Sequence, residues 1–396
     1  MQISRRAQGI RPSMTLAVDA KAKAMKAAGA DLVGFGAGEP DFRTPPHICQ
    51  AAIQAIRDGH HGYTPSAGLP ALRAAVAEYL RRTGGLAYKP EQVLITAGGK
   101  YALFEAFQAV LNPGDEAVLP APYWVSYAEQ IAFAGAKAVV ASARSDEGFK
   151  VSPRTLAAAI TPRTRAVVLN SPSNPTGVVY TRAELAALAD VLAGKDLWVF
   201  SDEIYNELLY DGVETASVAA LRPDLAAQTI TFGGASKTWA MTGWRIGWAA
   251  GPAEVIRAMD SLQGHSTSNP TSIAMHAALA AVTGDQGPFR AMLAEFDRRR
   301  RYMVERLGRM PGVRCVRPQG AFYCFPDFSA AYERVLGGRA DGPKSIAFAE
   351  KLLAEAKVAV VPGAAFGDDA CLRLSFATGM EAIEKGLDRI EKFLHT

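Results

Sequence analysis

Residues 165–205 read RAVVLNSPSNPTGVVYTRAELAALADVLAGKDLWVFSDEIY, and this stretch decides the fold class. It opens with a continuous apolar run, 165–170, which is typical of a strand buried on both faces of a sheet. A turn-rich segment follows, and Thr181 with Glu184 has the form of a capping box that opens a helix. The apolar run 197–200 predicts the next strand. Strand, helix and strand in this order predict an α/β domain with a mostly parallel sheet.

The same alternation continues on both sides of this stretch. Further strands are expected at 93–96, 116–119, 137–141 and 229–232, with helices at 99–111 and between 119 and 137. After a long Arg-rich helix at 288–310 the pattern changes to short strands at 313–316, 322–325 and around 358 and 372, with helices at 344–356 and 380–394. We therefore expect three parts: a segment 1–45 that packs with the small domain, a large domain 46–290, and a small α+β domain 291–396.

Composition excludes several classes of protein. The chain has 396 residues, 49% hydrophobic and 21% charged, so a sizeable core is available. A net charge of +4 is mild for this length and predicts no nucleic-acid partner. The local run Arg298–Arg301 is expected to be a solvated helix face. No apolar stretch approaches the ~20 residues of a membrane span, and no signal peptide is present, so we expect a cytoplasmic protein.

Metal and nucleotide motifs are missing from the sequence. The four cysteines form no C-x-x-C pair and the six histidines no H-E-x-x-H, so no metal site is expected. The glycine-rich stretch 34–38 lacks G-x-G-x-x-G, and Gly98-Gly99-Lys100 is not a complete P-loop. A nicotinamide dehydrogenase or an NTPase is therefore disfavoured.

Polar residues follow the expected strands at their carboxyl ends, where a parallel sheet forms its ligand crevice. Asn174 and Asp202 follow the two strands of the opening stretch, and Lys237 follows strand 229–232. Gly99 opens a helix after strand 93–96, where backbone N–H groups can cradle a phosphate. Taken singly, each has an ordinary explanation as a turn, a helix start or a surface residue. Their ordered combination predicts a single site.

That ordered set resembles the fold-type I pyridoxal-phosphate enzymes, and within them the class I aminotransferases, over nearly the whole chain. The stretch SKTWAMTGWRIG at 236–247 is similar to the family's lysine signature. Shorter matching motifs are GEPDF at 38–42, YTP at 63–65, PYW at 122–124, NPTG at 174–177, DEIY at 202–205 and LRLSFA at 372–377. RPSMT at 11–15, together with GGK at 98–100, is similar to the Ib branch of aspartate aminotransferases. Gly234 departs from the family, many members of which have a phosphate-binding serine there.

The resemblance implies a large domain with a mostly parallel seven-stranded sheet flanked by helices, a smaller α+β domain, and pyridoxal 5'-phosphate as cofactor. It implies that Lys237 bonds to the cofactor and shuttles a proton, that Asp202 holds the pyridine nitrogen protonated, and that Trp124 stacks on the ring. The remaining cofactor contacts that it implies are Tyr205 and Asn174 at the phenolic oxygen, and Gly99, Lys100, Ser236, Arg245 and the neighbouring subunit's Tyr63 at the phosphate. A homodimer is thereby implied; a Tyr63 buried in its own subunit is the alternative.

The implied substrate contacts divide between two ends of an amino acid. Arg373 grips the α-carboxylate, and Gly38, Trp124 and Asn174 lie beside it. The side-chain pocket is assigned to Lys100, Ser13 and Thr15, under an N-terminal segment that includes Arg11. In the alternative interpretation Lys100 serves only the phosphate or faces solvent.

The implied function is transfer of the amino group of L-aspartate, or a related acidic amino acid, to 2-oxoglutarate by a ping-pong mechanism. Prephenate or a broader aromatic and acidic range is the first alternative. A C–S lyase or a synthase acting on an activated side chain would share Lys237, Asp202 and Arg373. An aminotransferase-like domain of a transcription regulator is disfavoured, because it needs a basic DNA-binding domain ahead of a pattern that here begins at 11–15.

Overall fold

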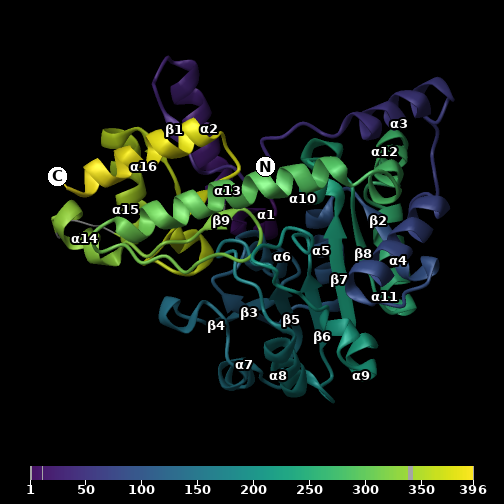
Figure 1. Cartoon of the computed structure of the whole chain (residues 1–396). Helices are drawn as coiled ribbons and strands as arrows, with labels where there is room; N and C mark the ends of the chain where they lie inside the picture. The colour runs from purple at the N-terminus through teal and green to yellow at the C-terminus, as the bar shows by residue number, and fades with distance from the viewer. Residues whose placement is uncertain (1, 11, 338–341, 396) are drawn as a thin grey trace.

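The computed structural model describes residues 2–10, 12–337 and 342–395, and a seven-stranded sheet forms its centre (Figure 1). The strand order is β2 (Val93–Thr96), β8 (Gly247–Ala250), β7 (Thr229–Gly234), β6 (Trp198–Asp202), β5 (Thr164–Asn170), β3 (Glu116–Ala121) and β4 (Lys137–Ser142). Only the two pairs that β8 makes are antiparallel. The mostly parallel seven-stranded sheet is confirmed. β8, whose four residues GWAA carry little strand signal, was not expected.

Alternate residues of the central strands pack into hydrophobic cores on opposite faces of the sheet. Ala166 and Val168 of β5 pack with α5 (Gly99–Val110), α6 (Ser126–Phe133) and α11 (Ala253–Gly264). Val167 and Leu169 pack on the opposite face with α7 (Pro153–Ala159) and α8 (Arg182–Leu192). Because neighbouring side chains of a strand point to opposite faces, a strand covered by helices on both faces is apolar throughout.

The expected capping box is present at the start of α8. The Thr181 hydroxyl accepts from the Glu184 backbone N–H at 3.2 Å, and the Thr181 N–H donates to the Glu184 carboxylate at 2.7 Å. The remaining helices around the large sheet are α4 (Pro70–Gly84), α9 (Pro223–Ala226), α10 (Ala235–Thr238) and α12 (Ser272–Thr283), and α3 (Pro46–Arg57) packs on α12.

The two ends of the chain pack together. β1 (Val33–Gly34) pairs in parallel with β10 (Val358–Ala359). α2 (Met14–Ala27) packs against β10, and α16 (Met380–Leu394) packs against β1. A three-stranded antiparallel sheet lies nearby, in the order β11 (Val361–Pro362), β12 (Leu372–Ser375), β9 (Tyr323–Cys324). The other helices are α1 (Arg5–Gly9), α13 (Gly287–Arg309), α14 (Ser329–Leu336) and α15 (Lys344–Lys351).

Three of the expected elements differ in the structure. The strand at 313–316 is wrong: Arg314 forms only an isolated bridge with Asp327. Beyond it Pro318 has no N–H for a ladder, and Gln319 and Gly320 donate instead to the Gly177 carbonyl, so the chain leaves the sheet. The strand expected at 322–325 shortens to β9. The helix expected at 344–356 is α15 followed by a π-helical turn, Leu352–Ala356.

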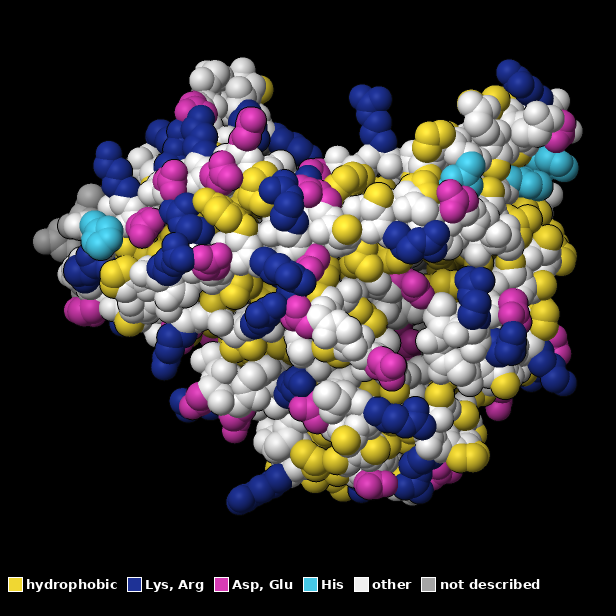
Figure 2. Space-filling model, viewed as in Figure 1, with side chains coloured by type: hydrophobic (Ala, Val, Ile, Leu, Met, Phe, Trp, Pro, Cys, Tyr) yellow, Lys and Arg dark blue, Asp and Glu magenta, His cyan; other side chains and the backbone are white. Residues whose placement is uncertain are grey.

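The arginine run on α13 is only partly solvated, so the expected solvated face is wrong for two residues. Arg299 and Arg300 are buried, and Arg300 contacts Asp211 at 2.7 Å and Asp297 at 2.6 Å. Four consecutive residues sweep a full helical turn, so some of them must face the interior. On the face shown in Figure 2, basic and acidic side chains are interspersed. Among the described residues no helix has the length and apolarity needed to cross a membrane.

Candidate active site

A cavity of about 670 Å³ lies between the carboxyl ends of the parallel strands, the N-terminal segment and the β9–β12 sheet. It brings together twelve of the residues expected in the site. These are Thr15, Gly38, Gly99, Lys100, Trp124, Asn174, Asp202, Tyr205, Ser236, Lys237, Arg245 and Arg373. Ser13 and Tyr63 are not in its lining, and Arg11 lies outside the described residues.

Lys237 follows β7 in the short helix α10. Its Nζ donates to the Gly38 carbonyl at 2.5 Å, which ties the sheet end to the N-terminal segment. Burial lowers the pKa of Lys237 to about 8; Glu39 opposes this lowering, and the cations Arg373 and Arg245 add to it. Roughly a tenth of an amine with this pKa is unprotonated at pH 7, far more than of an ordinary lysine, and this form can act as a nucleophile or a base.

Asp202 is the last residue of β6 and is buried. Its Oδ2 accepts from the Tyr127 hydroxyl at 2.5 Å and its Oδ1 from the Ile204 N–H at 3.2 Å. Burial raises the pKa of Asp202, whereas the Tyr127 hydrogen bond and the charge of Lys237 act to lower it. A buried carboxylate that accepts hydrogen bonds only from neutral donors keeps its charge available for a cationic N–H group.

Glycines allow close packing at one end of the cavity. Gly98 has φ +90°, and a Cβ there would lie 2.4 Å from Arg245 Nη2. A Cβ at Gly247 would lie 2.2 Å from the Gly99 nitrogen. The start of α5 and the Arg245 guanidinium are therefore adjacent, and together they offer backbone N–H groups and a cation to a phosphate.

The departure at Gly234 has a packing explanation. Its backbone is extended, and an added Cβ would lie 3.0 Å from Ile204 Cδ1 and 3.1 Å from the Ile246 carbonyl oxygen. A serine would require these neighbours to move. Ser236, which is buried and lines the cavity, remains the nearby hydroxyl.

Arg373 of β12 is buried but has no acidic partner among the described residues. Nη1 donates to Asn174 Oδ1 at 3.0 Å and Nη2 to the Gly36 carbonyl at 2.9 Å, while Nε has no partner. Its guanidinium carbon lies 4.4 Å from the ring centroid of Tyr323. A cation held only by neutral groups is suited to bind a carboxylate.

The Tyr205 hydroxyl is bonded to that of Tyr323 at 2.8 Å. Trp124 lies beside Tyr127 with an edge-to-face geometry, and Lys100 Nζ is 5.1 Å from the Trp124 ring centroid. Burial lowers the pKa of Lys100, and Arg245 lowers it further.

The N-terminal segment forms the outer wall. Thr15 and Leu16 of α2 line the cavity. Ser13 precedes α2, and its hydroxyl is hydrogen-bonded to that of Thr15 at 2.9 Å. Ser13 therefore does not line the cavity itself, but its hydroxyl can fix the position of the Thr15 side chain, which does.

Tyr63 lies elsewhere on the molecule. It is 93% exposed, so the alternative of a Tyr63 buried in its own subunit is wrong. An exposed tyrosine is available to a partner surface.

Several lining residues were not foreseen, and among them Tyr127, Tyr323 and Gly36 contact the expected site residues Asp202, Tyr205 and Arg373. Tyr127 follows Trp124 by three positions at the start of a helix, so helical spacing was a usable signal. Tyr323 and Gly36 carry no such signal, because their places depend on strand pairing between distant segments.

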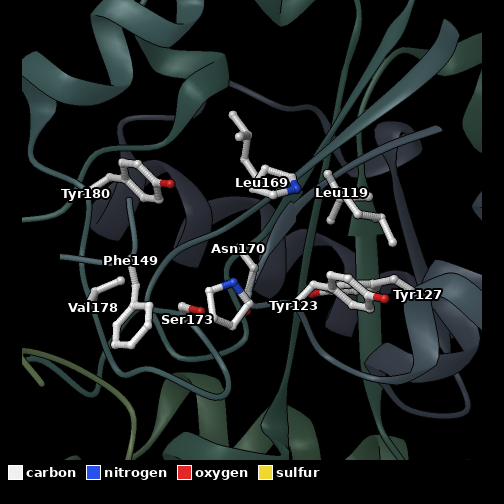
Figure 3. A pocket seen from close by; sticks show the side chains of 12 residues that line it. Leu119, Tyr123, Tyr127, Phe149, Leu169, Asn170, Ser173, Val178 and Tyr180 are labelled. Carbon is white, nitrogen blue, oxygen red and sulfur yellow. The ribbon is translucent and has the colours of Figure 1, made fainter. Parts of the chain in front are cut away.

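A second cavity of about 20 Å³ adjoins the first and shares Tyr127 and Asn170 with it (Figure 3). This volume holds about one water molecule. The large cavity is therefore the one with room for a cofactor and a substrate.

The chemistry of the large cavity fits pyridoxal 5'-phosphate. Asp202 suits a protonated pyridine nitrogen, Trp124 a ring face, and Lys237 an aldehyde carbon. The glycine-bounded cradle at Arg245 suits the phosphate, and the unpaired Arg373 Nε leaves a donor for a substrate carboxylate.

Comparisons with known proteins agree with this chemistry. Residues 30–390 match the family described as aminotransferase class I and II. The chain is 48% identical over 395 residues to the aspartate aminotransferase of Geobacillus stearothermophilus, covering 100% of this chain and 99% of the relative. It is 48% identical to the aspartate/prephenate aminotransferase of Cereibacter sphaeroides, covering 97% and 96%. The structure of the Thermus thermophilus aspartate aminotransferase with maleate superimposes with a TM-score of 0.92 at 45% identity, covering 99% and 100%.

Proposed function

The chain belongs to the class I and II aminotransferases, enzymes that depend on pyridoxal 5'-phosphate, and we propose that it transfers the amino group of L-aspartate to 2-oxoglutarate. One observation carries the proposal: the buried Arg373 guanidinium, with neutral partners only, shares a cavity with a lysine whose pKa is about 8. An amino acid supplies both the anion that Arg373 lacks and the amino group that the reaction needs. Relatives named for aspartate support the choice of substrate.

When bound, pyridoxal phosphate supplies the electron sink that labilises the Cα–H bond of an amino acid and accepts its amino group. Lys237 holds the cofactor and moves the proton at Cα. Asp202 keeps a proton on the pyridine nitrogen, oriented by the Tyr127 hydroxyl. Trp124 supports the ring, and the start of α5, Ser236 and Arg245 bind the phosphate.

Substrate orientation follows from the cations at the cavity walls. Arg373 binds the α-carboxylate through parallel N–H donors. We assign the distal carboxylate to Lys100, with Thr15, supported by Ser13, closing the outer wall and excluding water. Asn174 fixes Arg373 through its Oδ1, and Tyr205 is assigned to the phenolic oxygen of the cofactor.

The experiment that tests this function is a panel of single half-reactions. The purified holoenzyme is mixed with one amino acid at a time, and the absorbance of the bound cofactor is followed. Aspartate and glutamate should convert it, and 2-oxoglutarate should restore it. Release of pyruvate and ammonia from cysteine without a keto-acid acceptor would indicate a C–S lyase instead.

Prephenate is the second candidate substrate, favoured by the relative named for both activities. Like aspartate's partner 2-oxoglutarate, it carries a second carboxylate that Lys100 can bind. The amine-loaded enzyme should then be discharged by prephenate as well as by 2-oxoglutarate, and a failure with prephenate would restrict the enzyme to the smaller acids.

The active unit that we propose is a homodimer in which Tyr63 of one subunit serves the phosphate site of the other, supported by the exposure of Tyr63. Mixing Tyr63→Ala with Lys237→Ala subunits tests it. If Tyr63 acts across the interface, hybrid dimers keep one intact site, and random mixing restores about a quarter of wild-type activity. If it acts within its own subunit, mixing restores nothing.

The compartment is part of the same proposal. All four cysteines are free, which supports a reducing cytoplasm.

A further inference from the structure

Tyr323 lies at the junction of the two groups that bind cofactor and substrate. It is fully buried in β9 and pairs with Ser375 of β12. Arg373 is two residues from Ser375 on the same strand, so it projects from the same face and is the diagonal neighbour of Tyr323. Both residues line the large cavity.

The Tyr323 ring supports Arg373 without neutralising it. The ring centroid lies 4.4 Å from the guanidinium carbon, and Phe366 adds a second ring at 5.2 Å. A ring face attracts a cation through its quadrupole and uses none of its N–H donors. A carboxylate in this place would instead compete with the substrate for Arg373. The ring therefore orients the guanidinium and leaves its charge available.

The Tyr323 hydroxyl is committed to Tyr205. The two hydroxyl oxygens are 2.8 Å apart, and within the described residues neither has another hydrogen-bond partner. Tyr205 belongs to the loop after β6 of the large sheet, whereas Tyr323 belongs to the three-stranded sheet. When the Tyr323 hydroxyl donates, the Tyr205 hydroxyl keeps its own proton for the cofactor's oxygen and becomes a stronger donor.

We propose that Tyr323 is a positioning residue for transamination, acting on Arg373 through its ring and on Tyr205 through its hydroxyl. The proposal rests on the proposed function, because it assigns a substrate carboxylate to Arg373 and a cofactor oxygen to Tyr205. It links the two assignments: the Tyr323 side chain orients both the Arg373 guanidinium that binds the α-carboxylate and the Tyr205 hydroxyl that donates to the cofactor's phenolic oxygen.

Two substitutions separate the two roles. Tyr323→Phe keeps the ring and removes the hydroxyl, and Tyr323→Leu removes both. Tyr210→Phe is a matched control, because Tyr210 is also buried, donates its hydroxyl to the Ala321 carbonyl at 2.5 Å, and has Arg300 4.7 Å from its ring centroid, yet is not in the cavity lining.

The first readout is the pH midpoint of the cofactor's absorbance change in the holoenzyme. Losing a hydrogen bond that strengthens the Tyr205 donor should raise this midpoint by about 0.5–1 pH unit in Tyr323→Phe. Tyr210→Phe should leave it unchanged. A midpoint in Tyr323→Phe that falls, or that rises no more than in the control, overturns the proposal.

The second readout is the binding of maleate, a dicarboxylate without an amino group, to the holoenzyme. Tyr323→Phe should bind it within about twofold of wild type, and Tyr323→Leu about fivefold to thirtyfold more weakly, since the ring face is lost. Equal binding by both variants overturns the role of the ring. If Tyr323→Leu does not fold, the Tyr323→Phe midpoint decides alone.

These outcomes are distinct from failure of the proposed function. Neither readout requires turnover. A wild-type enzyme that binds maleate but is not converted by aspartate or glutamate overturns the function, whereas Tyr323 variants that match the control overturn only this inference.

Discussion

Two buried arginines, one on α13 and one on β12, have opposite kinds of partner. Arg300 of α13 is 0% exposed and is surrounded by Asp211, Asp297 and the Pro318 carbonyl. Arg373 of β12 is 2% exposed and has only neutral partners, with Nε unpaired. The first cation is neutralised by the protein and the second is not.

The difference separates structural charge from functional charge. Burying a cation without a counter-charge costs several kcal/mol, so a fold selected only for stability would pair it or replace it. Lys237, whose amine is buried, also forms no ion pair within the described part of the chain, and the same is true of the more exposed Arg245. The cavity therefore holds a positive charge that an anionic cofactor and an anionic substrate complement.

The largest expected effect is on kcat, and it comes from replacing Lys237, the lysine that we assign to proton transfer. Lys237→Ala should lower kcat for aspartate by about 10⁴-fold or more, because positioned proton transfer alone contributes roughly 10²–10⁴. The variant should fold and bind the cofactor noncovalently. Borohydride reduction of wild type followed by peptide mapping should label Lys237.

The matched control is Lys150→Ala, whose lysine is ion-paired to Glu184 at 2.7 Å. It should keep its activity. A borohydride label on Lys100, or none, contradicts the assignment of Lys237.

Replacing Arg373 and Arg300 separately by methionine tests directly whether the first serves activity and the second serves stability. Arg373→Met should lower kcat/KM for aspartate by about 10²–10⁴-fold, through two charge-assisted hydrogen bonds of about 1.5–3 kcal/mol each, and should leave stability unchanged or higher. Arg300→Met should lower the free energy of unfolding by about 1–3 kcal/mol, because it removes the hydrogen bonds of a buried cation to Asp211, Asp297 and the Pro318 carbonyl. The cost stays moderate because the two carboxylates are partly exposed and keep Arg317 and Arg301 as partners. Urea unfolding and steady-state kinetics measure both; a loss of stability in Arg373→Met equal to that in Arg300→Met would remove the distinction.

Lys100→Ala tests the lysine of the cavity wall to which we assign the substrate's distal carboxylate. Its kcat/KM for aspartate should fall roughly tenfold to hundredfold, since one hydrogen bond to a charged group is worth about 1.5–3 kcal/mol. Phenylalanine, which has no distal carboxylate, should lose much less. Equal losses for both substrates would place Lys100 at the phosphate.

The smallest expected effect is on the pH dependence of stability, and it comes from an acid that, like Arg373, has no partner of opposite charge among the described residues. Glu203 is half-buried, accepts from the Ser201 hydroxyl at 2.7 Å and has no cationic partner among the described residues; burial raises its pKa to about 7. Because this folded value lies above the unfolded one, its contribution to stability is fully present below about pH 4.5 and is lost as the pH rises to 7. Glu203→Gln should remove about 1–3 kcal/mol of this pH-dependent loss.

Urea unfolding of wild type and Glu203→Gln between pH 4.5 and 7.5 measures the effect. Glu295, whose pKa is held at about 2 by hydrogen bonds from Arg298 and Arg299, is the matched paired acid. Its contribution is present above pH 4.5 and is lost only as the pH falls toward 2, so Glu295→Gln should not alter the slope in this range. Parallel curves for wild type and Glu203→Gln would contradict the prediction.

By itself, the sequence determined the α/β class and most of the site on the sheet side. Short apolar runs such as 165–170, bounded by turn residues, are typical of strands covered on both faces, and parallel strands end at one edge. Asn174, Asp202 and Lys237 therefore had to meet, whatever the details of packing. Local order along the chain was enough for these residues.

The tertiary structure alone decided the opposite wall and the pairing of charges. Tyr323 meets Arg373 only because β9 pairs with β12, about fifty residues further along the chain, and Gly36 reaches Arg373 from the N-terminal segment. Arg299 and Arg300 are buried because of the rotation of α13 about its axis, which a run of four arginines does not reveal. Such contacts depend on register and on helix rotation between distant segments, and no local pattern encodes them.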